Sequence, residues 1–135
     1  MSGHFRELEV WQASMRLAGV THALADAQAD TVDNPADAGL AAELKQAAAA
    51  IPDQIARGHA DGDLAVFVQC LATARQACAT VTDRLPRLRV LLPAHAEAVE
   101  RGQDQAAEVD RMLARLHQAI TRKLQADAVT APQQR

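Results

Sequence analysis

Histidines and carboxylates are the residues of this chain that could hold a metal ion or exchange protons in catalysis. Di-iron helical proteins need inward-facing Glu-x-x-His pairs, but Ala114 stands three positions before His117 and Leu92 three before His95. The chain also lacks the Cys-x-x-Cys and His-x-x-x-His spacings of zinc sites and the glycine-rich motifs of nucleotide-binding enzymes. We therefore predict no catalytic residue, no metal, no cofactor and no small-molecule substrate.

Two side chains near the N-terminus have two interpretations each. His22 falls on an apolar stripe, where a buried, hydrogen-bonded histidine is commoner than a lone ligand. Trp11, the only tryptophan, could stack on a ligand or anchor a core. For both residues we favour packing.

Arginines are the one group of residues that could bind a partner by charge. Arg111, Arg115 and Arg122 fall on one face of the last predicted helix. A second group, at the end of the third predicted helix, consists of Arg84, Arg87 and Arg89. Such surfaces can contact phosphates, but cations also complement helix dipoles and pair with neighbouring acids, which we favour. A net charge of −3 and an aromatic content of 2% argue against a dedicated nucleic-acid binder.

The elements that carry these residues are predicted to be helices. The 135 residues are 49% hydrophobic, and most of these are alanine and aliphatic residues, a composition typical of an all-α fold. Apolar spacing predicts one domain over residues 6–127, between an N-terminal tail (1–5) and a disordered tail (128–135). Its predicted helices cover residues 6–29, 38–59, 63–89 and 94–126. Short loops between such helices predict an antiparallel, up-down-up-down four-helix bundle.

Local signals mark the ends and bends of these helices. Asp37 is the expected N-cap of the second helix, and Asp61 or Asp63 that of the third. Pro52 predicts a kink within one bent helix, and Pro86 a kink or an end. The third helix carries a heptad seam formed by Leu64, Phe67, Leu71, Ala74, Cys78, Val81, Leu85 and Leu88.

The first predicted helix has two adjacent apolar stripes, which is more surface than one neighbouring helix needs. Either it lies deep in the bundle or part of it faces another subunit. The residues predicted to form the core or an oligomer contact are Val10, Trp11, Leu17, Val20, Leu24, Ala47, Ile51, Pro52 and Ile55.

The cysteines and the apolar segments indicate a compartment. Cys70 and Cys78 lie eight positions apart on one helix, about 12 Å, too far to bridge each other. We identify no signal peptide and no apolar stretch approaching the ~20 residues that span a bilayer. These features predict a reduced, cytoplasmic protein without a membrane partner.

Two stretches resemble a known family. Residues 5–12 read FRELEVWQ, similar to the family's aromatic opening followed by Leu-x-Val-Trp-Gln. Residues 44–58 read LKQAAAAIPDQIARG, similar to its Ile-Pro segment, with Gln54 and Arg57 where Asn and Glu are usual. The family comprises four-helix-bundle proteins encoded in intervening sequences of 23S ribosomal RNA genes and accessory proteins of diversity-generating retroelements.

This resemblance implies a ring-shaped homopentamer without enzyme activity. It also implies that the retroelement members bind nucleic acid and a reverse transcriptase through a basic surface. We therefore predict a non-enzymatic, homo-oligomeric scaffold or interaction protein. The alternative is a nucleic-acid-binding or ribonucleoprotein accessory factor that binds RNA or DNA through the last helix.

Overall fold

The computed structural model describes residues 5–31 and 34–130, and within them it contains helices and no strand. The four long helices are α1 (Glu9–Ala29), α2 (Leu40–Asp61), α3 (Leu64–Leu91) and α4 (Ala96–Thr130). Three short 3-10 turns are η1 (Phe5–Glu7), η2 (Pro35–Asp37) and η3 (Pro93–His95). The prediction of an all-α fold is confirmed.

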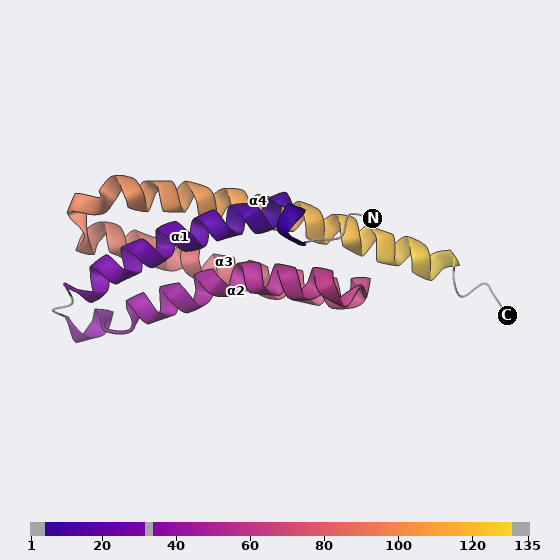
Figure 1. Cartoon of the computed structure of the whole chain (residues 1–135), viewed down its shortest axis with the longest axis horizontal. Helices are drawn as coiled ribbons and strands as arrows, with labels where there is room; N and C mark the ends of the chain where they lie inside the picture. The colour runs from indigo at the N-terminus through magenta and orange to yellow at the C-terminus, as the bar shows by residue number, and fades with distance from the viewer. Residues whose placement is uncertain (1–4, 32–33, 131–135) are drawn as a thin grey trace.

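The four long helices lie side by side along the long axis of the molecule (Figure 1). Consecutive helices are in contact, and α1 also contacts α4. The C-terminal part of α4 extends beyond the turn that joins α2 to α3 (Figure 1). Each helix therefore packs between two neighbours, and the end of α4 projects past them.

The ends of the chain differ from the predicted tails. Phe5, assigned to the N-terminal tail, belongs to η1, and its ring centroid lies 5.4 Å from that of Trp11. Residues 128–130, assigned to the disordered tail, continue α4 because no helix-breaking residue precedes Pro132. The rest of both predicted tails, residues 1–4 and 131–135, lies outside the described residues.

The prediction that Asp37 caps α2 is wrong. Asp37 closes η2, and α2 begins after Gly39 without a side-chain cap. The carboxylate of Asp37 is instead hydrogen-bonded to Arg87 of α3, which satisfies it better than a neutral backbone amide would. An interhelical contact thus displaces the local cap.

The connection between α2 and α3 follows from its turn residues. Gly62 has a φ of 85°, a left-handed conformation that favours glycine after a helix. Asp63 then caps α3 by accepting a hydrogen bond from the amide of Ala65 at 2.8 Å. The predicted cap at Asp61 or Asp63 is confirmed at Asp63, and the two helices are joined within two residues.

Both interior prolines lie inside unbroken helices. α2 runs through Pro52, which is buried, and it changes direction near its middle (Figure 1). α3 runs through Pro86 and ends five residues later, so Pro86 does not end the helix. Pro86 is exposed on the outer face of α3, so the helix loses one backbone hydrogen bond there without disturbing the core.

The core is built from the predicted apolar faces. In α3, every seam residue from Phe67 to Leu88 is buried, while Leu64 is half-buried. α2 and α3 approach closely at Gly58, where an added Cβ would lie 2.7 Å from Cδ1 of Phe67. Glycine is therefore required there by packing.

The expectation that no apolar stretch is long enough to cross a membrane is corrected at α3. Among the described helices, α3 is long and apolar enough to cross a bilayer by length and composition, because Arg75 is the only charge between Asp63 and Asp83. A helix in the core of a soluble protein passes the same test, and α3 packs against both α2 and α4. The statement that no stretch reaches spanning length was wrong.

Candidate functional site

Titratable side chains do not gather into a catalytic or metal-binding cluster in residues 5–31 and 34–130. No group of three or more histidines, cysteines or acids there is arranged to hold a metal ion. The Nδ1 atom of His22 lies 2.7 Å from the carbonyl oxygen of Ala18, so that nitrogen donates to the backbone. Trp11 is half-buried, with Phe5 against its edge. Neither ring lines any of the four hollows formed by residues 28–46, 75–91 and 107–125.

The residues predicted for the core or an oligomer contact divide into two sets. The buried set comprises Val10, Leu17, Leu24, Ile51, Pro52 and Ile55. Trp11, Val20 and Ala47 are half-buried at the edge of that core. Only this second set has surface left to contact another molecule.

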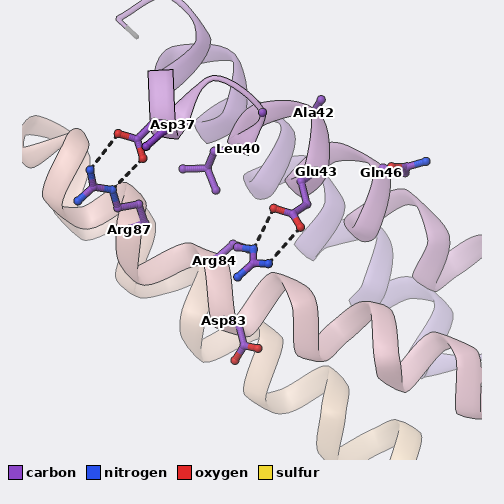
Figure 2. A pocket seen from close by; sticks show the side chains of 10 residues that line it. Asp37, Leu40, Ala42, Glu43, Gln46, Asp83, Arg84 and Arg87 are labelled. Atoms are coloured by element: carbon purple, nitrogen blue, oxygen red, sulfur yellow. Dashed lines mark hydrogen bonds and ion pairs between the residues drawn. The ribbon is translucent and has the colours of Figure 1, made fainter. Parts of the chain in front are cut away.

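The arginines at the end of α3 are paired with acids of other helices. Figure 2 shows Arg84 and Arg87 reaching from α3 toward Glu43 and Asp37. Arg84 donates to the two carboxylate oxygens of Glu43 at 2.9 and 3.2 Å. Arg87 donates to those of Asp37 at 3.0 and 2.9 Å. Arg89 lies 3.6 Å from Glu100 of α4.

The Arg84–Glu43 and Arg87–Asp37 pairs line an open groove of about 660 Å³ between the start of α2 and the end of α3. Hydrogen bonds from Arg84 and Arg87 lower the pKa values of Glu43 and Asp37 below their ordinary values. The same bonds raise the pKa values of both arginines. Because each cation already has a bidentate carboxylate, this groove joins two helices and offers little free charge to an anion.

The three arginines of the predicted stripe on α4 have different surroundings. Arg111 donates to Glu108 at 2.7 Å, and this bond lowers the pKa of Glu108. Arg115 is exposed and lines neither of the two hollows between α3 and α4. Arg122 is exposed and lines one of them. The three arginines share a helix face but do not line one hollow, and their predicted contact with nucleic acid stays a prediction.

Two open hollows follow the seam between α3 and α4. The first, about 380 Å³, is lined by Cys78, Ala79, Thr82, Asp83, Ala107, Asp110 and Arg111. The second, about 530 Å³, is lined by Arg75, Ala114, His117, Gln118, Thr121, Arg122 and Gln125. We call the second hollow the basic groove, because two arginines and no carboxylate line it.

Cys78 lies beside the first hollow but is not a nucleophile in this state. It is fully buried, and its thiol donates to the carbonyl oxygen of Ala106 at 3.4 Å. Burial, together with the nearby charge of Asp110, raises the pKa of the thiol to about 11. A thiol that stays protonated at neutral pH is a small apolar packing residue.

Sequence analysis missed Arg75 and His117, which line the basic groove from α3 and α4. The sequence did contain a signal for Arg75, because it is the only charged residue between Asp63 and Asp83. The guanidinium group of a lone arginine on an apolar helix has to reach solvent at the edge of the buried face. His117 carried no such signal, because its place beside Arg75 depends on how α3 and α4 pack.

Comparison with known proteins gives one match. A family model described as 23S rRNA-intervening sequence protein matches residues 6–115. No curated protein and no solved structure matches the chain. The matched span covers α1 to α3 and the first part of α4. It includes residues 44–58 and all but Phe5 of residues 5–12, the two stretches that carried the resemblance. The chain therefore belongs to the 23S rRNA-intervening sequence protein family.

Proposed function

We propose that this protein is a non-enzymatic, homo-oligomeric interaction module of the cytoplasm, built as an antiparallel, up-down-up-down four-helix bundle. The order of neighbouring helices and the two-residue turn between α2 and α3 support the antiparallel bundle. The free cysteines Cys70 and Cys78 suit a reducing compartment.

The observation that carries the oligomer is apolar surface left uncovered by the single chain. On α1, Met15 is 44% exposed, and Trp11 is only half-buried one helical turn away. On the projecting end of α4, Leu124 is half-buried. Apolar side chains that are left exposed gain burial when another molecule covers them.

A second copy of the chain is the partner that we infer for this surface, and the family resemblance favours five subunits. Light scattering at micromolar concentration tests the assembly. We expect a mass near five times that of the 14.4 kDa chain. Met15→Glu and Leu124→Glu should reduce the mass, because each would place a charge in the subunit contact.

Gln76→Glu, an exposed change on α3, is the matched control and should leave the mass unchanged. A wild-type monomer would refute the oligomer. A pentamer that both variants leave intact would show that subunits meet through another surface.

The basic groove supports a second candidate function, nucleic-acid binding as an accessory factor. Arg122 lines it from α4 as an exposed cation, and Arg75, which lies 3.6 Å from Asp110, lines it from α3. Binding of single-stranded RNA that is strongest at low salt would support this function, because phosphate contacts release counterions. The absence of any binding at low salt would exclude it.

A further inference from the structure

Asp37 holds the connection between α1 and α2 against α3. Its side chain is only 9% exposed, and its carboxylate accepts hydrogen bonds from Arg87 at 3.0 and 2.9 Å. Its backbone carbonyl oxygen accepts a hydrogen bond from the side-chain amide of Gln28 at 3.3 Å. Figure 2 shows the carboxylate of Asp37 directed toward α3. One residue therefore ties the connection to α1 and to α3.

The first turn of α2 lacks the acceptors that a helix start normally has. In the described part of the chain, the backbone amides of residues 39–42 have no hydrogen-bond acceptor, and the amide of Glu43 is the first to donate, to Gly39 at 3.0 Å. An N-cap side chain usually accepts from one of these amides, but Gly39 has no side chain. Leu40 and Ala41 are buried, where a missing acceptor is costly.

The backbone before α2 is already close to helical. Ala38 has φ −63° and ψ −31°, and Gly39 has φ −94° and ψ −1°, both in the right-handed region. If Asp37 adopted the extended conformation of an N-cap, its carboxylate could accept from Gly39 or Leu40 and its carbonyl oxygen from Ala41. This change would cost the two hydrogen bonds that close η2 and the pair with Arg87.

We propose that Asp37 is a two-position switch. In the first position it pairs with Arg87 and holds the connection on α3. In the second position it leaves Arg87 and becomes the N-cap of a longer α2 that begins at Ala38. The bidentate pair is the stronger contact, so the first position is the resting state. The second is accessible because the carboxylate finds acceptor-deficient amides beside it.

The switch also changes the surface at this end of the molecule. Asp37 and Arg87 line both the groove of about 660 Å³ and a neighbouring hollow of about 280 Å³. The rest of the smaller hollow is formed by Gln28, Thr31, Asn34, Val90 and Leu91. The pair therefore lies on the common boundary of the two hollows. When Asp37 moves to α2, the hydrogen bonds across this boundary are lost and the Arg87 guanidinium group becomes free.

Exchange rates of single backbone amides, measured by NMR, test the switch. Arg87→Gln removes the pair and leaves the Asp37 carboxylate in place. We expect exchange of the Gly39 or Leu40 amide to slow roughly fivefold, the protection that one capping hydrogen bond provides. Arg84→Gln is the matched control, because Arg84 lies one turn away on α3 and pairs with Glu43 instead. It should leave these rates unchanged.

Two variants of Asp37 show whether its side chain causes the protection. In the double variant Asp37→Ala with Arg87→Gln, the protection should disappear, because no carboxylate remains to cap α2. Asp37→Asn should be protected even with Arg87 present, because asparagine caps helices as well as aspartate does but forms no ion pair. Protection that survives Asp37→Ala would overturn the proposal.

Two further results would refute the switch. Faster exchange across residues 36–41 in Arg87→Gln would show that the released connection only frays. Equal protection of Gly39 and Leu40 in wild type and Arg87→Gln would show that the position of Asp37 does not depend on the pair. If circular dichroism shows that Arg87→Gln does not fold, Arg87→Lys decides, because lysine keeps the charge but loses bidentate donation. Intermediate protection in Arg87→Lys would support the switch, and wild-type rates would refute it.

Discussion

At the scale of single residues, the position of the acids decides which cations are free. Arg84 and Arg87 are 41 and 50 positions from their carboxylates in the chain, so their pairing depends on how α2 packs against α3. Arg111 pairs with Glu108 only three positions away, a contact that helical spacing predicts. Whether a cation is paired therefore depends both on its own helix and on the helix that packs against it.

Buried polar residues follow a line along α1. Ser14, Thr21 and Gln28 are spaced by seven and are at most 1% exposed. The hydroxyl of Ser14 donates to the carbonyl oxygen of Trp11 at 2.7 Å, whereas the hydroxyl oxygen of Thr21 has no partner among the described residues. The two hydroxyls therefore make different contributions to stability.

Replacing Thr21 with valine should stabilise the protein. Thr21→Val keeps the shape of the side chain and removes a buried hydroxyl without a partner, so the free energy of unfolding should rise by about 1 kcal/mol. Urea denaturation monitored by circular dichroism measures this change. Ser14→Ala is the contrasting variant and should give no gain, because it loses a made hydrogen bond. Destabilisation of Thr21→Val would mean that the hydroxyl is bonded in solution.

At the scale of the elements, periodicity identified four helices and local signals placed some of their ends. The heptad seam of α3 predicted its buried face, and Asp63 predicted its start. The start of α2 could not be predicted, because Asp37 is held by Arg87, a contact between distant segments. Pro86 predicted a kink or an end, but its exposed side leaves the helix intact through Leu91.

Only part of the basic groove could be predicted from the sequence, again because contacts between different helices decide which residues meet. Sequence analysis found Arg122 and placed it beside Arg115, since both lie on one helix face. The structure places Arg122 with Arg75 instead, across the seam between two helices. Which residues of different helices share a groove follows from interhelical packing, which spacing within one helix does not reveal.

Two glycines in long helices should respond to alanine in opposite ways. At Gly58 an added Cβ would lie 2.7 Å from Cδ1 of Phe67 and 2.9 Å from Cβ of Cys70, so α2 and α3 must separate. We expect Gly58→Ala to lose up to about 2 kcal/mol, since the cost of overpacking exceeds the gain in helix propensity. At Gly102 the nearest atom, Cδ1 of Leu85, is 3.5 Å away, an ordinary contact.

Gly102→Ala is thus the matched control and should gain about 1 kcal/mol from helix propensity. Paired denaturation curves give both values. Equal effects at the two positions would contradict the close approach of α2 and α3 at Gly58.

At the scale of the whole molecule, the ion pairs make stability depend on pH. The pKa values of Asp37, Glu43 and Glu108 are lowered in the folded protein by hydrogen bonds from arginines. The unfolded chain therefore binds more protons in the acid range, so these pairs stabilise the fold above the ordinary values of 3.8 and 4.5. Their contribution is lost as pH falls through the lower folded values.

Melting temperature measured against pH tests this linkage. We expect it to fall below about pH 4.5 and to fall less steeply in Arg84→Gln, which removes the hydrogen bonds that lower the pKa of Glu43. Arg57→Gln is the control, because Arg57 lies 3.6 Å from Asp53 within one exposed surface of α2. A profile of Arg84→Gln parallel to that of wild type would show that this pair does not contribute.

The order in which the helices neighbour one another governs how fast the chain can fold. Three of the four main contacts join consecutive helices, and the connection between α2 and α3 is only two residues long. Little chain entropy is lost in closing such loops, and helical proteins of low contact order fold within about microseconds to milliseconds. The contact between α1 and α4 is the exception, because it brings together opposite ends of the sequence.

A stopped-flow experiment should therefore find that changes at the contact of α2 with α3 slow refolding. Changes where α1 meets α4 should instead accelerate unfolding.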